Sequence, residues 1–410
     1  MQLRDIADYV SERINSDYVE LENYITTDCL LPNKQGRTIA TNLPPKKYSL
    51  IKFQKGDILV SNIRPYLKKI WFAECNGGAS TDVLVFRAKK EHLSTYLYSV
   101  LLQDSFYEWT MKGPKGSRMP RGDKNQIMRF HIVDIAESAY PTGKIIKALN
   151  EKISLNKQIN QNLEALARQL YDYWFVQFDF PDANGKPYKS SGGKMVYNPI
   201  LKREIPEGWE GVVLRDVIQH INTGLNPRDN FTFGGEIKYI TVKNLTKDGY
   251  IDFSSCDTID EDARCKVHTR SQIEVGDILY ASICPLGRTY LITEEPNDWD
   301  INESVFSIRP NYKKITSEYL NMLLKDDYYI AKLSNSSTGS IFLGIRIKQL
   351  ESTQILLPSY NILSAFTKQI KDIVRLQANN YQQILSLTKQ RDELLPLLMN
   401  GQVNFDLSDD

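Results

Sequence analysis

The segment MKGPKGSRMPRGDK, residues 111–124, gathers basic side chains in a stretch whose glycines and prolines predict a loop. Such a loop can follow a line of phosphates, and an arginine in it can donate two hydrogen bonds to a guanine edge in the major groove of DNA. A solvated surface loop is the alternative interpretation. The residues of this loop that we expect to contact nucleic acid are Lys112, Lys115, Ser117, Arg118, Arg121 and Lys124.

Further groups of this kind occur in both halves of the chain. The stretch SNIRPYLKKIW adds a second basic patch in the first half, made of Arg64, Lys68 and Lys69. In the second half the candidates are mostly hydrogen-bonding residues suited to base edges or phosphates. They are Thr223, Asn226, Arg228, Lys243, Asn244, Ser282, Arg288, Ser336, Thr338, Ser340 and Arg346.

No catalytic or metal-binding pattern accompanies these groups. NLPP, residues 42–45, lacks the aromatic residue with which an amino-methyltransferase stacks on a flipped base. There is no GxxxxGK[ST] phosphate loop and no GxGxxG after a strand, and none of the four histidines lies in a triad or HExxH context. The five cysteines form no CxxC pair, so we expect free thiols and no metal. The sequence predicts a chain that is not an enzyme and binds no cofactor.

Composition places the chain among ordinary globular proteins. Its 410 residues are enough for two or three domains, and its net charge of +1 means that any surface for nucleic acid must be local. The N-terminus has no signal pattern and no run is apolar enough to span a membrane, so we expect a cytoplasmic protein.

The sequence repeats itself at long range. GDIL occurs at residues 56–59 and 276–279, and each copy leads to an Ile-x-Pro, at residues 63–65 and 283–285. YVELEN at 18–23 parallels YITVKN at 239–244, LRDI at 3–6 parallels LRDV at 214–217, and KGS at 115–117 roughly matches TGS at 338–340. Matches in one order indicate two homologous domains. Short alternating runs beside helical segments predict a mixed α/β fold for each.

A long helix is expected after each domain, because apolar residues recur at alternating steps of three and four. The first seam is Leu149, Ile153, Asn156, Asn160, Leu163, Ala167, Leu170 and Trp174. The second is Ile362, Phe366, Ile370, Ile373, Gln377, Asn380, Ile384, Leu387, Arg391 and Leu394. Both seams turn polar at their centre.

An antiparallel coiled coil would match these polar centres, with Asn156 facing Asn380 and Asn160 facing Gln377. A polar layer of this kind specifies register at some cost in stability. The expected fold is α+β, with two homologous recognition domains joined by two helices in a pseudo-two-fold dumbbell. Two unrelated core helices are the alternative. The expected boundaries are 1–143 and 209–359 for the domains, 144–178 and 360–396 for the helices, 179–208 for a linker and 397–410 for a tail.

Three sequence features resemble one family, the specificity subunits of Type I restriction–modification systems. Residues 155–210, LNKQINQNLEALARQLYDYWFVQFDFPDANGKPYKSSGGKMVYNPILKREIPEGWE, are similar to the family's central conserved region. Residues 391–405, RDELLPLLMNGQVNF, are similar to its distal conserved region, and GDIL appears in both heads. The resemblance covers essentially the whole chain.

The resemblance implies a division of labour between subunits. Each head would read one half of a bipartite, gapped DNA site, and the helices would set the gap. Two modification subunits, which bind S-adenosylmethionine and methylate adenine, would dock on the conserved regions. Restriction subunits would supply the ATP- and Mg²⁺-dependent translocation and nuclease activity. We expect docking at Tyr171, Trp174, Phe175, Leu394 and Leu395. The family's heads vary, so no base contact is carried over.

Two other functions remain open at this point. A non-catalytic coiled-coil scaffold with protein-binding heads would show no salt-dependent DNA affinity. The third hypothesis is an enzyme in which this chain supplies only the part that recognises the DNA. A DNA-specificity subunit would show steep salt dependence and prefer one gapped site.

Overall fold

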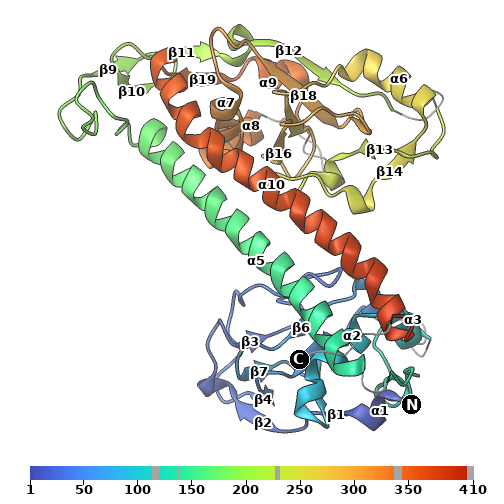
Figure 1. Ribbon diagram of the computed structural model, residues 1–410. Helices are drawn as coiled ribbons and strands as arrows, with labels where there is room; N and C mark the ends of the chain where they lie inside the picture. The colour runs from blue at the N-terminus through green and yellow to red at the C-terminus, as the bar shows by residue number, and fades with distance from the viewer. Residues whose placement is uncertain (113–119, 136–137, 227–230, 337–343, 404–410) are drawn as a thin grey trace, which may run out of the picture. The chain divides into compact units, whose positions relative to one another are not determined.

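The computed structural model describes residues 1–112, 120–135, 138–226, 231–336 and 344–403. The described chain divides into two compact units (Figure 1). Unit 1 comprises Met1–Lys157 with Gln382–Asp410, and unit 2 comprises Gln158–Tyr381. Each unit therefore contains one head and parts of both long helices, whereas the sequence-based boundaries separate heads from helices.

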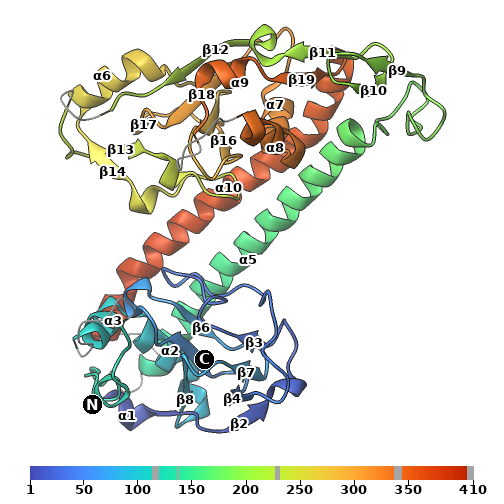
Figure 2. The same cartoon turned by 180° about the vertical axis from the view of Figure 1, so that it is seen from behind.

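The head of unit 1 is built on two four-stranded sheets (Figure 2). One sheet has the order β1-β8-β5-β6, with strands at Ala7–Tyr9, Val83–Ala88, Ile58–Ser61 and Ile70–Phe72. The other has the order β2-β4-β7-β3, with strands at Arg13–Asn15, Ser49–Phe53, Gly77–Ala79 and Tyr24–Ile25. The helices of this head are α1 (Leu3–Ile6), α2 (Ser94–Leu102), α3 (Asp104–Met111) and α4 (Lys124–Ile127).

The head of unit 2 contains a corresponding four-stranded sheet and a three-stranded one. The first has the order β12-β18-β15-β16, with strands at Ile218–Thr223, Val305–Pro310, Ile278–Ala281 and Thr289–Leu291. The second has the order β14-β13-β17, at Asp257–Ile259, Ile237–Ile240 and Trp299–Ile301. The helices are α6 (Glu261–Ser271), α7 (Ser317–Lys325), α8 (Asp327–Ser336) and α9 (Ile347–Glu351).

The internal repeat extends to topology and to buried charge. The order β1-β8-β5-β6 corresponds to β12-β18-β15-β16, and the parallel pair β3·β7 corresponds to β13·β17. The aspartate of each GDIL motif is buried, and both of its carboxylate oxygens accept hydrogen bonds from one arginine. Arg87 donates to Asp57 at 2.8 Å and 2.8 Å, and Arg309 donates to Asp277 at 2.8 Å and 2.9 Å. Each aspartate also accepts a backbone N–H from the preceding turn. GDIL is thus a folding element, because it joins a turn to a buried ion pair.

The first long helix begins earlier than expected. Helix α5 runs from Ala139 to Tyr171 and continues as a π-helix over Asp172–Val176, whereas the sequence predicted 144–178. Pro141 does not prevent the start, because proline is tolerated in a first helical turn. Gly143 is required where it lies, since a Cβ there would stand 2.4 Å from the Tyr96 backbone nitrogen. The second long helix, α10, spans Tyr360–Met399.

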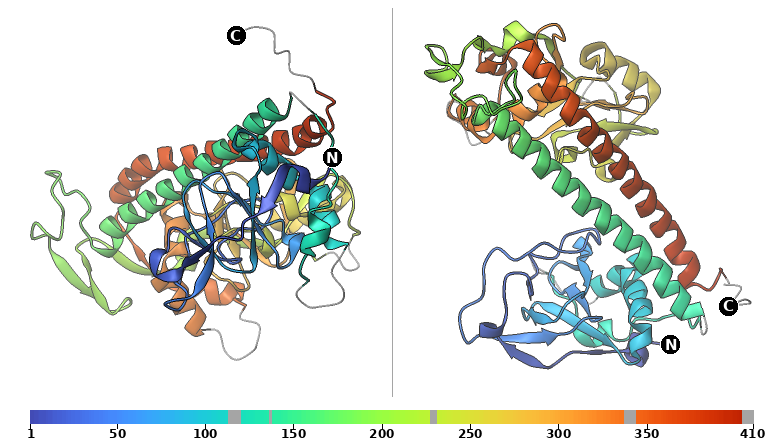
Figure 3. Two further views of the ribbon diagram at one scale, coloured as in Figure 1. Left: turned by 90° about the horizontal axis from the view of Figure 1, so that it is seen from below. Right: turned by 60° about the vertical axis from the view of Figure 1, so that its left-hand side comes forward.

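The segment between helix and second head is ordered rather than a simple linker. It contains a hairpin of β9 (Met195–Asn198) and β10 (Arg203–Pro206), followed by β11 (Glu210–Val213) paired with β19 (Gln354–Leu357). Phe180 stacks between Tyr188 and Trp209, with ring centroids 4.7 and 4.9 Å away. The hairpin, whose backbone Figure 3 shows, is attached to the core of unit 2 by the buried Ile205 of β10, with Met195 and Val196 of β9 packed against the same core.

Candidate nucleic-acid interface

In the first head, three segments far apart in sequence meet at one place. Ile63 forms a β-bridge with Arg121, the Arg64 N–H donates to the Pro120 carbonyl at 2.9 Å, and the Gly122 N–H donates to the Asn62 carbonyl at 3.3 Å. The Asn62 N–H in turn donates to the carbonyl of Asp82, at the turn between β7 and β8, at 2.9 Å. This backbone network fixes the described end of the predicted basic loop against the GDIL strand.

The basic side chains of this head have different partners. Arg121 donates from Nη2 to Asp82 Oδ1 at 2.9 Å, with the arginine side chain 62% exposed. Lys112 lies over the Trp109 ring and Lys124 over the Tyr9 ring, at 5.6 and 5.9 Å from the centroids. Both remain exposed, so their charges can meet phosphates. Lys115, Ser117 and Arg118 lie outside the described residues.

Two other expected contacts, Lys68 and Lys69, are engaged within the fold. Lys68 shares Asp104 with Lys34, with N–O distances of 2.9 and 2.8 Å, and Lys69 donates to the Thr27 carbonyl at 2.6 Å. Burial lowers the pKa of the Lys34 ammonium. Burial alone would raise the pKa of Asp104, but hydrogen bonds from the two lysines outweigh it and lower that pKa. Lys68 is therefore already paired with the Asp104 carboxylate, which would weaken its attraction for a phosphate.

Several expected residues of the second head also serve the fold. Asn244 is buried, accepts from the backbone and hydroxyl of Thr241, and donates to the Asp252 carbonyl at 3.3 Å. Ser282 is buried and donates to the Ser304 carbonyl at 2.6 Å. Both side chains are thus enclosed in this structure, and their polar atoms bond within the head. Arg288 donates to the Leu245 carbonyl at 2.9 Å.

The remaining candidates of the second head gather at turns and loop ends. Asn226 donates from Nδ2 to Glu303 Oε1 at 2.6 Å, at the turn between β17 and β18. The Thr223 hydroxyl accepts from Arg270 Nη2 at 3.3 Å. Lys243 and Arg346 are exposed. Arg228, Thr338 and Ser340 lie outside the described residues, as does the side chain of Ser336.

The polar layer between the long helices is present, with a changed pairing. Within unit 2, Asn160 donates to the Gln377 carbonyl at 3.1 Å and accepts from Asn380 Nδ2 at 3.1 Å. Within unit 1, Asn156 donates to Gln383 Oε1 at 3.1 Å, so the expected pairing of Asn156 with Asn380 is wrong.

The changed pairing reflects a shift of register. Side-chain contacts in both units lie three or four residues further along α10 than expected, for the ring pair Trp174–Phe366 as well as for the amides Asn156–Gln383 and Asn160–Asn380. The helices nevertheless run antiparallel within each unit. In unit 1, Asn150 bonds Arg391 further along α10 than Asn156 bonds Gln383. In unit 2, Trp174 packs on Phe366.

Four of the five expected docking residues are buried in the cores, and the fifth, Leu394, is partly buried. Tyr171, Trp174 and Phe175 are at most 4% exposed, and their rings pack on Phe366 and on the head of unit 2. Leu395 is 3% exposed, and Leu394 packs against the core of unit 1. Of these residues Trp174 and Leu394 are seam positions, which the partner helix covers, and Tyr171 and Phe175 pack on the head of unit 2.

An exposed apolar stripe along α5 and the π-helix that follows it was not predicted. Ile159, Leu166 and Tyr173 are 38%, 51% and 38% exposed, and they recur at seven-residue spacing on one helix face. The same spacing rule that identified the seam could have identified this second stripe. It leaves an apolar helix face of unit 2 open to a partner.

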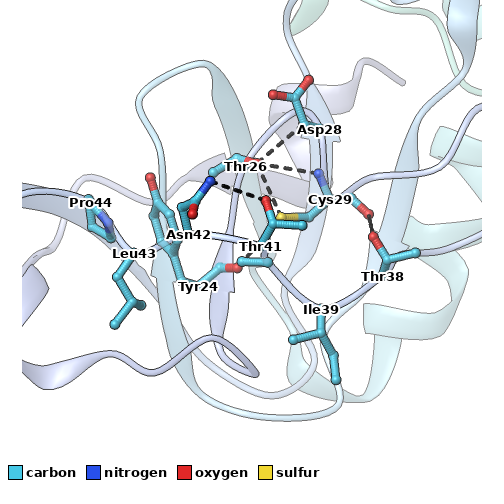
Figure 4. Close-up of a pocket in the computed structure, with 11 residues that line it drawn as sticks. Tyr24, Thr26, Asp28, Cys29, Thr38, Ile39, Thr41, Asn42, Leu43 and Pro44 are labelled. Atoms are coloured by element: carbon cyan, nitrogen blue, oxygen red, sulfur yellow. Dashed lines mark hydrogen bonds between the residues drawn. The ribbon is translucent and has the colours of Figure 1, made fainter.

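A pocket of about 300 Å³ lies in the first head between residues 24–29 and 38–44 (Figure 4). Its polar groups bond mainly to each other: the Cys29 thiol lies 3.1 Å from the Thr26 hydroxyl, which also accepts from the Cys29 N–H at 3.3 Å. Among the described lining residues there is no histidine to activate that thiol, so the pocket offers no recognisable nucleophile.

The described ranges contain neither a metal-binding cluster nor a membrane-spanning helix. No group of three or more histidine, cysteine or carboxylate side chains there could hold a metal ion. Among the same residues, no helix is long and apolar enough to cross a membrane.

The chain is similar in sequence to specificity subunits of Type I restriction enzymes. Residues 206–394 match the family described as Type I restriction modification DNA specificity domain. The MjaIX specificity subunit of the Type I restriction enzyme of Methanocaldococcus jannaschii is 26% identical over 385 residues, covering 90% of this chain and 82% of that protein. The HindI specificity subunit of Haemophilus influenzae is 25% identical over 460 residues, covering 98% of each.

A solved structure supports the fold. The crystal structure of a Type I restriction–modification system S subunit from M. genitalium superposes with a TM-score of 0.59 at 12% identity, covering 97% of this chain and 95% of that one. The likeness extends over both heads and both long helices.

Proposed function

We propose that this chain, a member of the specificity-subunit family of Type I restriction–modification systems, recognises a bipartite DNA sequence and does not itself carry out catalysis. One observation carries the proposal above all. The two heads share one sheet order, and each has a buried Asp–Arg pair at its GDIL motif. Yet the turn between β7 and β8 carries Ser80, Thr81 and Asp82, and the corresponding turn between β17 and β18 carries Asn302, Glu303 and Ser304. Two domains of the same fold with different polar side chains at their surface turns suit the recognition of two different half-sites.

The long helices would set the spacing between the half-sites. Helices α5 and α10 each include residues of both units, and the hydrogen-bonded polar layer would specify one register of their pairing. Because a helix rises about 1.5 Å per residue, the number of residues in these helices would determine the length of the gap in the DNA site.

Modification subunits would dock on the exposed stripe of α5 instead of on the buried aromatic residues. Leu166→Asp should weaken co-purification with a modification subunit at least tenfold, because it places a charge in an apolar contact. Gln161→Asp is the matched control, since it adds the same charge to an exposed position of the same helix outside the stripe. Equal effects of the two variants would reject this docking surface.

The chain's partners would then be double-stranded DNA, two modification subunits and the restriction subunits. S-adenosylmethionine, Mg²⁺ and ATP would bind to those partners and not to this chain. The alternative, a scaffold with protein-binding heads, makes a different prediction for DNA.

The test is the DNA affinity of this chain in complex with its modification subunits, measured from 50 to 200 mM salt. A specificity subunit gives a steep salt dependence and prefers one gapped duplex over a scrambled duplex of the same length. Affinity that is independent of both salt and sequence would favour the scaffold.

A further inference from the structure

Arg121 stands on an unusually fixed piece of backbone. The bridge to Ile63 and the hydrogen bond between Arg64 and Pro120 hold it on one side. On the other side Gly122 packs so closely that a Cβ would lie 2.7 Å from Thr110 and 2.9 Å from Ile127. The base of the Arg121 side chain is therefore set by the fold of the head, although its guanidinium reaches solvent.

Asp82 fixes the outer end of the same side chain. The Asp82 carboxylate lies 2.9 Å from Arg121 Nη2 and comes from the β7–β8 turn, whose backbone is tied to Asn62. A guanidinium has five N–H donors in a planar fork. A bond from one Nη2 hydrogen to Asp82 leaves donors on its other edge for a two-pronged contact.

The carboxylate also decides what kind of ligand Arg121 favours. A lysine over an aromatic ring, such as Lys112 or Lys124, keeps its full charge and attracts phosphate. Arg121 is already paired with a negative group, and Asp82 would repel a phosphate brought close to the pair. A base edge is neutral and suffers no such repulsion. Guanine offers the two acceptors, O6 and N7, that the fork matches.

We propose that Asp82 is a positioning residue that holds Arg121 for two-pronged recognition of a guanine in the first half-site. The inference rests on the proposed function, because it assumes that this head reads DNA. It assigns Arg121 to the base and the exposed Lys112 and Lys124 to the phosphates, a division that the sequence alone did not make.

A carboxylate at the corresponding turn of the second head also has a polar partner, but from a different segment, because the bridge that matches Ile63–Arg121 is Ile283–Gly344 and Gly344 has no side chain. Glu303, between β17 and β18, accepts from the amide of Asn226 at 2.6 Å, as Asp82 between β7 and β8 accepts from Arg121. In both heads a turn carboxylate thus contacts a side chain of a type that reads bases.

The experiment maps methylated adenines in cells that carry the complete system with Asp82→Asn, Arg121→Lys or Asp8→Asn in this chain. Asp8 is the control, because it is another exposed carboxylate of the same head and lies 3.7 Å from Lys89. Arg121→Lys keeps the charge and loses the fork. It should reduce discrimination at one G·C pair of the first half-site by about 5- to 150-fold and leave the second half-site unchanged.

Asp82→Asn should act differently from a simple loss of contact. It frees the Arg121 charge for phosphate, so the affinity for non-specific DNA should rise and the slope of log affinity against log salt should steepen by about 1. Discrimination at the same G·C pair should fall. An unchanged first half-site and an unchanged slope in both variants would overturn the inference.

The two levels of the account fail in distinguishable ways. If the unaltered complex methylates no gapped motif that depends on this chain, the proposed function fails. If that motif is present and contains no guanine in either strand of the first half-site, only the role of Arg121 and Asp82 fails.

Discussion

Replacing Asn160 by leucine tests the polar layer of the helix pair. Asn160 is 4% exposed, and it makes one bond to the Gln377 carbonyl and one to the Asn380 amide. The Gln377 carbonyl keeps its place in the α10 hydrogen-bond ladder, so the main loss falls on Asn380, whose amide is left partly buried without its partner. Such a group costs about 1–3 kcal/mol, and the half-buried position of Asn380 favours the lower part of that range.

The double variant Asn160→Leu with Asn380→Leu should recover most of the loss. Replacing both partners of a buried polar pair by apolar groups is often nearly neutral, because no donor or acceptor remains unpaired. The coupling energy between the two sites should therefore be about 1–2 kcal/mol. The assay is urea unfolding followed by hydrogen exchange of peptides from α5 and α10, which reports on unit 2 separately.

Strictly additive effects of the two leucines, with no recovery in the double variant, would refute this reasoning. Recovery of stability should come with a loss of register, because an apolar seam permits helices to shift by a heptad. The matched control is Asn150→Leu. Asn150 is half-buried and bonds Arg391 in unit 1, so Asn150→Leu should not couple to Asn380.

The remaining predictions concern buried charge and buried hydroxyl groups. Asp277→Asn should destabilise unit 2 by about 3 kcal/mol, because it removes the buried carboxylate that pairs with Arg309, whose side chain is 12% exposed, and leaves that arginine only the exposed carboxylate of Glu274. Asp57→Asn should cost unit 1 less, because Arg87 is 29% exposed and water can replace the carboxylate; urea unfolding of each unit compares the two. Burial raises the pKa of Tyr98 to about 12, so its contribution to stability should be complete below pH 10 and disappear between pH 10 and 12. In Tyr98→Phe the free energy of unfolding should fall less between pH 10 and 12 than in the unaltered chain. Tyrosinate absorbance and urea unfolding at each pH would measure this.

Sequence periodicity and repetition predicted the two heads and both long helices. GDIL and Ile-x-Pro repeat because the turn, the buried aspartate and the following strand form one folding unit in each head. The helix seams were visible because their apolar steps are local in the sequence. These features needed no knowledge of distant contacts.

Features that depend on contacts between distant segments could not be predicted in the same way. Asp82 carries no signal of its own, and only the bridge from Ile63 to Arg121 brings it beside that arginine. Asn244 and Ser282 looked like ligand-binding groups because their types are polar, but the fold encloses both. For Trp174 the sequence did contain the signal, since a seam position is covered by the partner helix.

The central claim is that two heads read two half-sites at a spacing that the helices set. Its most direct test inserts one heptad into α5 after Lys157 and one into α10 after Tyr381, and maps methylated adenines in the cell. Seven residues add about 10 Å of helix, close to three base pairs of DNA. The account predicts the same two half-sites separated by a gap about three base pairs longer. Altered half-sites with an unchanged gap would contradict it.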